Sequence, residues 1–426
     1  AGLGCSTTPQ HRTTGALAAR APDFERVRFR LEEGVQEVSP NWVLHPRLGM
    51  FEIDSRDASG FVVRVYPTES TVRQDSGQTD LASAAPTSPA VLQHHGELRE
   101  ASRGLPDRGQ WRDSFALTSR GGSDVTLYAP PTRKGSGTPS IWSRRDGKWT
   151  AEPHAWPAFR HEYGGIAVGD FDGDARLDVA LAMHLHRFTA LLAAPGAAWR
   201  EQAAGLPGNR GARESGVAAA TLRGRRADRL VLLRESDGVP PGPDASPGLA
   251  EYVWSGDAWR SHPIEPRLAG ASLSLAQLPG CRPLLSVVPS GNNRAPVFER
   301  RGGRWEALDV SAALGSLFPS LWYLSASRAG QMDGTGCQDL VLARWARAGK
   351  GWLPSIDLLL RDRGRDWHRM SIQPASPHRI TALALNRSRA GDALLLSGDT
   401  HGRLSLYRME GEELAWIATL ESSEWR

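Results

Sequence analysis

The sequence predicts an all-β fold, a seven-bladed β-propeller built from four-stranded antiparallel blades. Three observations lead to this prediction. Short apolar, β-prone segments recur at intervals of about 51 to 64 residues, and periods of this length are typical of propellers and repeat arrays. A second landmark, a short turn followed by a large apolar residue, recurs with them. The 45 glycines and 29 prolines of the 426-residue chain are consistent with a fold that has many tight turns.

The first landmark is an apolar strand that follows a loop rich in Gly, Asp and Arg. Counted from the first residue of each copy, the gaps are about 64, 54, 51, 54, 56 and 53 residues. Runs of four to six apolar residues bounded by turn residues favour strands. The seven copies are Phe61–Tyr66, Val125–Tyr128, Val179–Ala182, Leu230–Leu233, Leu284–Val288, Leu340–Ala343 and Ala393–Leu396.

The second landmark follows later in each unit, and a strand precedes each of its turns. Each unit therefore holds about four strands, which is the content of a propeller blade. We expect the aromatic residues to pack between blades; an aromatic series that stacks on sugars or on a cofactor is the alternative. The residues at this position are Leu98, Trp149, Trp199, Trp259, Trp305, Trp367 and Trp416.

These landmarks divide the chain into three parts. Residues 1–23 have the composition of a flexible tether, and residues 24–47 contain an alternating strand that either pairs with the last blade to close the ring or forms a small appendage. Residues 48–426 are expected to form the seven blades. A four-stranded sheet with two apolar faces cannot bury both alone, so the blades pack face to face around an axis.

One loop has the residue spacing of a calcium site. Residues 163–184 read YGGIAVGDFDGDARLDVALAMH, with a short acidic loop between two apolar runs. Calcium takes about 6–8 oxygen ligands, and several carboxylates on one short loop suit it. Without a cation, these carboxylates would repel one another. The predicted ligands, at loop positions 1, 3, 5, 7 and 9, are the side chains of Asp170, Asp172, Asp174 and Asp178 and the carbonyl of Arg176.

An EF-hand does not explain this loop. An EF-hand requires Gly at position 6, a bidentate Glu at position 12 and flanking helices. Here those positions are Ala175 and Leu181, and the flanking segments favour strands. A solvated acidic turn that binds nothing is the remaining alternative.

A degenerate copy of the loop lies at residues 331–344, QMDGTGCQDLVLAR. Asp333, Gly334 and Asp339 superpose on the corresponding residues of the first loop, but Gln331 and Thr335 replace two of its aspartates. With two carboxylates gone, we expect this second loop to bind calcium weakly or to be empty.

The run GDFDGDARLDVALA resembles the FG-GAP or VCBS-type repeat of integrin α-subunit propellers and many bacterial surface proteins. The resemblance is strong over residues 163–184 and moderate over 321–345. It implies calcium at the acidic loop, on the five positions given above. Because only one loop is complete, a single structural ion is expected.

The sequence around Cys5 and the calcium loop predict an extracytoplasmic location, periplasmic or on the cell surface, because calcium is scarce in the cytosol. AGLGCSTTPQ resembles the end of a bacterial lipoprotein signal, which would place a lipid anchor on Cys5. Cys281 and Cys337 each follow Gly at the same position of neighbouring units. Neighbouring blades can bring them together as a disulfide; two separate small thiols are the alternative.

No motif for catalysis or for nucleic-acid binding stands out. The sequence has no G-x-S-x-G elbow, P-loop or HExxH motif. Its formal charge of +4 is contributed mostly by arginine, and the basic run Arg223–Arg226 lacks the interleaved aromatics of nucleic-acid modules. Residues converging at the axial channel would escape a search of this kind.

Three functional hypotheses follow. The first is a non-enzymatic, calcium-stabilised scaffold or accessory subunit that binds a protein partner in the bacterial cell envelope. The second is a carbohydrate-active propeller enzyme, such as a polysaccharide lyase or a sugar dehydratase. The third is a glycan-binding adhesin with repeated pockets and exposed Trp side chains. The choice of the first is partly analogy, because one fold hosts many functions.

Overall fold

The computed structural model describes residues 25–30, 36–39, 42–45, 49–65, 92–94, 98–100, 103–105, 116–119, 125–129, 140–145, 148–153, 165–183, 187–197, 199–207, 216–234, 248–314, 321–334, 336–348, 351–361, 367–374, 376–387, 392–410 and 413–420. The expected tether at residues 1–23 and the expected lipid anchor at Cys5 lie outside these ranges.

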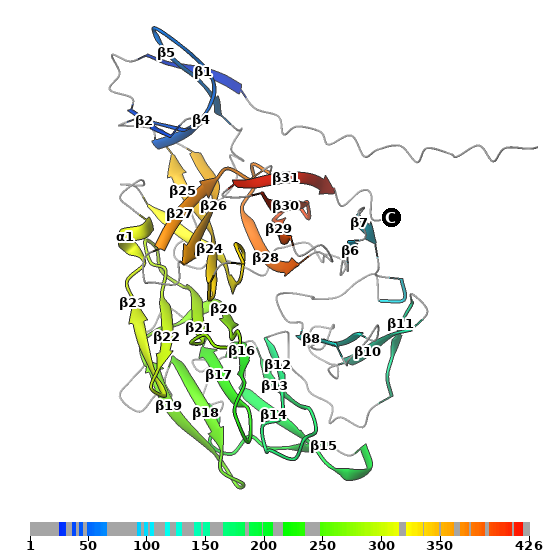
Figure 1. The fold of residues 1–426 in the computed structure, drawn as a ribbon. Coiled ribbons are helices and arrows are strands. Elements are labelled where there is room, and N and C mark those ends of the chain that lie inside the picture. The colour runs from blue at the N-terminus through cyan, green and yellow to red at the C-terminus, as the bar shows by residue number, and fades with distance from the viewer. Residues whose placement is uncertain are drawn as a thin grey trace, which may run out of the picture.

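Six four-stranded antiparallel sheets form the blades, arranged around a common axis (Figure 1). The strands of blades 1 to 3 are β8 (Ala116–Ser119), β9 (Val125–Ala129), β10 (Ser140–Arg145), β11 (Lys148–Ala151); β12 (Ile166–Gly169), β13 (Asp178–Ala182), β14 (Phe188–Ala193), β15 (Trp199–Glu201); β16 (Gly216–Leu222), β17 (Arg229–Arg234), β18 (Leu249–Trp254) and β19 (Trp259–Glu265).

Blades 4 to 6 follow the same order in the sheet, and within each blade every strand pairs with the next one along the chain. Their strands are β20 (Gly270–Ala276), β21 (Leu284–Pro289), β22 (Val297–Arg301), β23 (Arg304–Leu308); β24 (Trp322–Gly330), β25 (Asp339–Ala348), β26 (Gly351–Arg361), β27 (Trp367–Ile372); β28 (Ile380–Arg387), β29 (Ala393–Asp399), β30 (Leu404–Glu410) and β31 (Glu413–Leu420).

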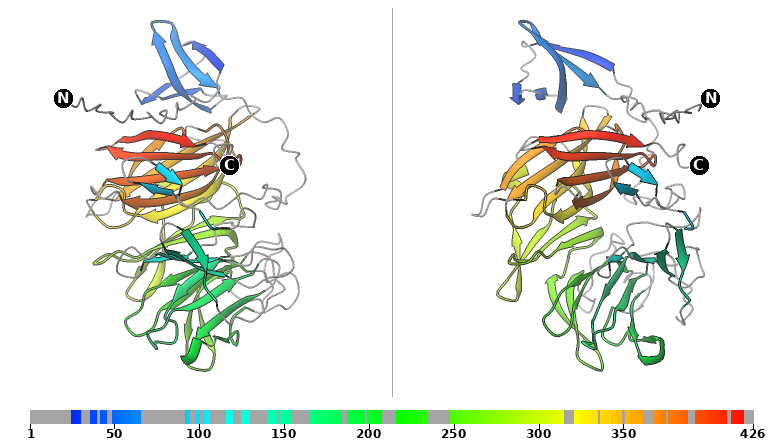
Figure 2. Two further views of the ribbon diagram at one scale, coloured as in Figure 1. Left: turned by 90° about the vertical axis from the view of Figure 1, so that its right-hand side faces the viewer. Right: turned by 45° about the vertical axis from the view of Figure 1, so that its right-hand side comes forward.

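The prediction of seven blades was therefore wrong by one. The unit expected around Phe61–Tyr66 belongs to a separate five-stranded sheet, in the order β1-β5-β4-β3-β2, which lies beyond the last blades (Figure 2). Its strands are β1 (Glu25–Arg30), β2 (Gln36–Ser39), β3 (Trp42–His45), β4 (Gly49–Asp57) and β5 (Gly60–Val65).

Two features of the sequence explain this error. The first gap, about 64 residues, is longer than the others. In addition, β5 carries the charged Arg64 within its apolar run, whereas β21 has no charged residue and β13 has one only at its first position, Asp178; both strands are buried at every position. Uninterrupted apolar strands fit a sheet buried on both faces, and an interrupted one does not.

Of the two roles expected for the N-terminal segment, ring closure is the one that the strand pairing contradicts. β1 pairs with β5, Val27 opposite Val63 and Phe29 opposite Phe61, and not with the last blade. The five-stranded sheet consequently runs across the boundary expected at residue 48. Leu98, the expected second landmark of the first unit, begins β7 (Leu98–Glu100), which forms a two-stranded sheet with β6 (Leu92–His94).

Small residues on the inner strands let neighbouring blades approach closely. A side chain at Gly165 would place its Cβ 2.7 Å from the Cα of Ala218 in the next blade, and one at Gly330 would meet Leu385 of blade 6 at 2.7 Å. The first strands β12, β16, β20, β24 and β28 therefore contact one another in order around the axis.

The turn-following aromatic residues mostly face the interior, as packing between blades requires. Trp149 and Trp259 are buried, and Trp199, Trp305 and Trp367 are partly buried, whereas Trp416 is 41% exposed. Trp259 reaches back to blade 2, where its ring meets Phe171 edge to face and its Nε1 donates to the carbonyl of Gln202 at 3.0 Å.

Helical structure is sparse in the described residues. It consists of α1 (Ser311–Leu314) and one 3₁₀ turn, Pro195–Ala197. None of the described helices is long and apolar enough to span a membrane.

Candidate metal centre

The acidic loop connects β12 to β13, and the paired residues Gly169 and Asp178 stand at its two ends. Two residues of the loop have left-handed backbone, Gly173 with φ of 80° and Ala175 with φ of 68°. A side chain at position 173 would bring its Cβ within 3.1 Å of the Arg226 carbonyl oxygen in the next blade. The left-handed conformation costs a non-glycine residue about 1 kcal/mol, so Ala175 must be held in place by other contacts.

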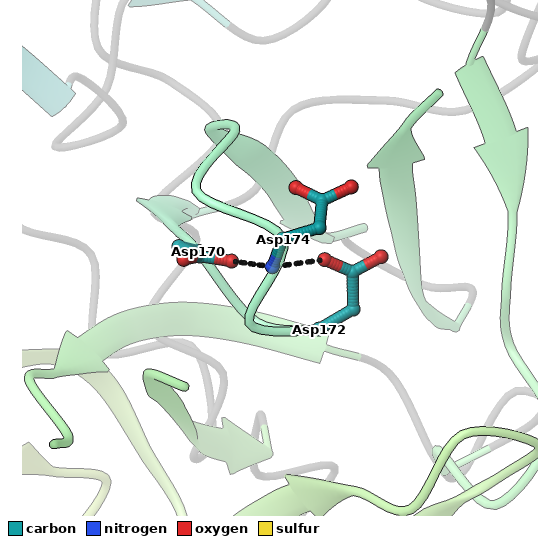
Figure 3. A group of neighbouring side chains, drawn as sticks. All are labelled: Asp170, Asp172 and Asp174. Carbon is teal, nitrogen blue, oxygen red and sulfur yellow. Dashed lines mark hydrogen bonds between the residues drawn. The ribbon is translucent and has the colours of Figure 1, made fainter. Parts of the chain in front are cut away.

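The carboxylate of Asp170 supplies those contacts. Its Oδ1 accepts hydrogen bonds from the backbone N–H groups of Gly173 at 2.8 Å and Asp174 at 3.0 Å, and its Oδ2 accepts one from Ala175 at 3.0 Å. Figure 3 shows the backbone nitrogen of Asp174 between the carboxylates of Asp170 and Asp172, with 3.3 Å to Asp172 Oδ1. The loop is thus wound around its first aspartate.

Three of the five predicted ligands come together in this loop. Asp170, Asp172 and Asp174 each offer a carboxylate oxygen, and these oxygens lie within 4.8 Å of one another. All three residues are half-buried. Partial burial and the negative charges of Asp174 and Asp170 raise the pKa of Asp172. A cation between the carboxylates would relieve both effects.

Asp178 occupies a different position from the other three carboxylates. It is 0% exposed, and its Oδ2 accepts the N–H of Phe171 at 2.7 Å while its Oδ1 accepts the N–H of Ala193 at 2.8 Å. Burial raises the pKa of Asp178 to about 7. Its carboxylate joins the acidic loop to the end of β14.

Arg176 enters the site through its side chain. Its guanidinium pairs with Asp174 Oδ2, and its backbone N–H donates to Asp174 Oδ1 at 2.8 Å. The Arg176 side chain is 43% exposed, so this ion pair contributes little to stability. The Arg176 guanidinium offsets the negative charge of Asp174 but forms no ion pair with Asp170 or Asp172.

The sequence did not predict that this loop joins two blades. The N–H of Asp170 donates to Asp228 Oδ2 at 3.0 Å, and the N–H of Asp228 donates to the carbonyl of Asp170 at 2.7 Å. Asp228 is buried in blade 3 and also accepts from Arg223 Nη1 at 2.7 Å. Asp228 directly precedes the second strand of blade 3, and the acidic loop likewise precedes the second strand of blade 2. This shared position is the one sequence feature that could have indicated the contact.

The degenerate loop of blade 5 repeats the geometry of the first, as the superposed residues predicted. Gly334 has φ of 77°, matching Gly173. Asp339 Oδ2 accepts from Met332 N–H at 2.6 Å and its Oδ1 from Arg361 N–H at 3.0 Å. Burial raises the pKa of Asp339 to about 6. In place of the first aspartate, Gln331 donates from Nε2 to the carbonyl of Gly336 at 3.0 Å.

A disulfide joins this second loop to the neighbouring blade. Cys281, between β20 and β21, bonds to Cys337, between β24 and β25, with the two Cα atoms 5.4 Å apart. Of the two sequence-based alternatives for these cysteines, the disulfide is the one in the structure.

Comparison with solved structures finds similar chains of low sequence identity. Similar chains include the periplasmic gluconolactonase PpgL of Pseudomonas aeruginosa, 13% identical with a TM-score of 0.51, covering 78% of this chain and 92% of that one. A fungal lectin from Aleuria aurantia, a six-bladed β-propeller, is 15% identical with a TM-score of 0.40, covering 74% and 97%. AofleA from Arthrobotrys oligospora is 10% identical with a TM-score of 0.41, covering 73% and 87%.

At these identities the likeness concerns the fold alone. No protein-family model and no curated protein matches the sequence. The strand pairing of the described residues shows an all-β, six-bladed propeller with four-stranded antiparallel blades.

Proposed function

We propose that the chain is a non-enzymatic, calcium-stabilised β-propeller that serves as a binding scaffold for a protein partner outside the bacterial cytoplasm. One observation supports this most strongly. Three half-buried carboxylates converge in the acidic loop of blade 2, which is hydrogen-bonded to Asp228 of blade 3. One cation bound there would stabilise both blades.

The donor set suits calcium better than a softer metal. Every side-chain donor in the cluster is a carboxylate oxygen, without His or Cys, and calcium prefers such oxygen ligands. In this proposal the carboxylates of Asp170, Asp172 and Asp174 bind the ion, and the carbonyl oxygen of Arg176 is the fourth ligand from the loop. Asp178 lies behind the loop and holds its backbone.

The resemblance to FG-GAP or VCBS-type repeats supports the same assignment. The complete loop pattern occurs once in the sequence, and the second loop lacks two of its carboxylates. A single structural ion therefore fits better than a row of ions across the propeller. The contribution of calcium would be to fix one junction of the ring.

The disulfide supports an extracytoplasmic location. Bonds such as Cys281–Cys337 form and persist in oxidising compartments. The chain would work in the periplasm or at the cell surface, with Cys5 as the lipid attachment point. Mass spectrometry of the membrane-extracted protein would detect a lipidated cysteine; recovery of the native protein with unmodified residues before Cys5 would exclude it.

The aromatic residues at the second landmark do not favour the adhesin hypothesis in its original form. That hypothesis required repeated, equivalent pockets with exposed Trp side chains. Trp149 and Trp259 are buried, and Trp416 is exposed. These residues are thus not equivalent to one another. As for the second hypothesis, no feature of the described residues favours a carbohydrate-active enzyme.

Thermal unfolding with calcium or with a chelator tests the ion. A ligand that binds only the folded state stabilises it by about 2.7 kcal/mol at a hundred-fold excess over Kd. We expect the wild-type melting temperature to rise with calcium, and Asp172→Asn to abolish the rise. Asp333→Asn, at the equivalent position of the degenerate loop, is the matched control and should leave the rise intact.

A wild-type melting temperature that is the same in calcium and in chelator would contradict the site. The scaffold role is tested separately, by cross-linking in intact cells followed by purification of the full chain. We expect a defined envelope protein to be captured in stoichiometric amount with the wild type. Recovery of the monomer alone would contradict the scaffold role and leave the calcium result unaffected.

A further inference from the structure

Blade 5 has a hairpin that is longer than the fold requires. β25 and β26 contain 10 and 11 residues, whereas the equivalent strands β17 and β18 of blade 3 contain 6 each. The added length extends past the core toward the N-terminal sheet, with β4 approaching β25 (Figure 1). This extension is not needed to build a blade.

The extension displays three aromatic rings on one face, which we call the aromatic ladder: Tyr323, Trp345 and Trp352. Tyr323 pairs with Trp345 across β24 and β25. The rings of Trp345 and Trp352 are nearly parallel, 3° apart in orientation with centroids at 6.3 Å, and Tyr323 lies 5.5 Å from Trp352. One bound ring system could contact more than one of them.

The ladder faces solvent, in contrast to the other face of the same strands. Tyr323 is 38% exposed, and Trp345 and Trp352 are partly exposed with the N-terminal sheet in place. On the opposite face, Trp322 packs against the buried cluster between blades 4 and 5. The ladder residues belong to none of the hydrophobic clusters between the blades in the part of the chain that the structure describes.

Polar and basic groups border the ladder. Arg347 pairs with Trp352 across the hairpin and is exposed. From blade 4, Asn292 forms a β-bridge with Tyr323, and its neighbours Asn293 and Arg294 are exposed. Asn293 holds this segment against β24 because its Oδ1 accepts from the N–H of Trp322 at 2.9 Å. None of these bordering residues is acidic.

We propose that the aromatic ladder binds an acidic oligosaccharide. The face of an aromatic ring carries partial negative charge, so it attracts the C–H groups on the apolar face of a sugar ring. Arginine pairs with carboxylates through two parallel hydrogen bonds; Arg347 lies across the hairpin from Trp352, and the exposed Arg294 follows two residues after Asn292. Exposed amides supply further donors and acceptors for hydroxyl groups.

This site differs from the calcium site and from the Trp residues of the second landmark. The ladder lies on blade 5, and its contacts do not involve the acidic loop of blade 2. The proposal therefore goes beyond the scaffold function and does not depend on it. Chelation of calcium at a temperature where the protein stays folded should leave saccharide binding unchanged.

Titration of the full chain with oligogalacturonate of six units tests the proposal, with tryptophan fluorescence and calorimetry as readouts. We expect saturable binding, at least about ten-fold tighter than binding of the neutral probe cellohexaose. Trp352→Ala and Trp345→Ala should each weaken binding about ten-fold or more, as for aromatic residues at the centre of a binding surface.

Two further variants separate the ladder from general effects. Arg347→Gln removes a charge at an exposed site and should weaken oligogalacturonate binding about five-fold, without changing the melting temperature. Trp416→Ala removes an exposed tryptophan on blade 6 and should have no effect. Equal binding in Trp416→Ala and in the wild type, with loss in the ladder variants, is the expected pattern.

Several outcomes would overturn the proposal. These are the absence of saturable binding, equal affinity for the acidic and neutral saccharides, or unchanged binding in Trp345→Ala and Trp352→Ala. Tighter binding of an oligothymidylate or of a polyglutamate peptide than of oligogalacturonate, lost in the same variants, would assign the ladder to another class of ligand.

Discussion

The loop of blade 2 and the loop of blade 5 are built on one template but are joined to their neighbours by different means. In both, a buried aspartate, Asp178 or Asp339, accepts two backbone N–H groups and fixes the hairpin. Blade 2 then places three carboxylates in the loop, whereas blade 5 has a disulfide to blade 4. The turn geometry of this repeat therefore does not depend on the metal-binding residues.

The largest effect is expected from the covalent link. Replacing Cys281 and Cys337 by Ser opens a cross-link between residues 56 positions apart in the sequence. A disulfide of this kind stabilises by about 2 to 4 kcal/mol, chiefly by restricting the unfolded chain. We expect the double variant to unfold at a lower guanidinium concentration than the oxidised wild type.

The reduced wild type is the control for this experiment. It should unfold at the same denaturant concentration as the double variant, because both lack the same bond. Identical midpoints for the oxidised protein and the double variant would mean that the link does not hold blades 4 and 5 together.

The buried aspartates come next in expected size. Asp178→Ala leaves two backbone N–H groups without their acceptor, which we expect to cost about 2 to 3 kcal/mol. The loss should persist in the presence of a chelator, because these hydrogen bonds do not involve the ion. Asp339→Ala should cost a similar amount, which tests the common template directly by denaturant unfolding.

The outcome in chelator discriminates between two roles of Asp178. If Asp178→Ala and the wild type became equally stable once calcium is removed, Asp178 would act only as a metal ligand. Its burial and its two hydrogen bonds argue for the structural role.

This template shows what sequence could predict. The spacing of Asp172, Gly173 and Asp178 recurs at Asp333, Gly334 and Asp339, and the left-handed glycines and buried aspartates superpose accordingly. The loop itself is readable from the sequence because the hydrogen bonds to Asp170 within it span only 3 to 5 residues. The all-β class and the four-stranded blades were predictable for the same reason.

Apart from the disulfide, which joins equivalent positions of neighbouring units, the polar contacts between blades were not predictable. Buried Glu251 of blade 3 accepts from Arg300 Nε at 3.1 Å and from Trp305 Nε1 at 2.8 Å, both from blade 4. These partners are 49 and 54 residues away in the sequence, so no spacing rule identifies them. The same limit hid the pairing of β1 with β5, and with it the true number of blades.

Rebuilding the degenerate loop would sharpen the comparison further. Gln331→Asp with Thr335→Asp restores the two missing carboxylates around Asp333 and the left-handed Gly334; position 335 lies outside the described residues. We expect the double variant to gain a second calcium ion, measured by calorimetry. Calcium at ten-fold excess over Kd would stabilise it by about 1.4 kcal/mol. Unchanged stoichiometry would mean that the template does not suffice for binding.

The smallest effect concerns the dependence of stability on pH. Burial raises the pKa of Asp339 to about 6, above its unfolded value of about 3.9. The folded state therefore binds the proton more tightly. The resulting stabilisation is fully present below about pH 4 and is lost as the pH rises through about 6.

We expect the free energy of unfolding of the wild type, relative to Asp339→Asn, to fall by about 1 kcal/mol from pH 5 to pH 6. Burial raises the pKa of Asp178 to about 7, so in calcium-free protein the corresponding decline should extend to about pH 7. A difference between wild type and Asp339→Asn that stays constant over this interval would show that the Asp339 carboxylate is already ionised in the folded protein.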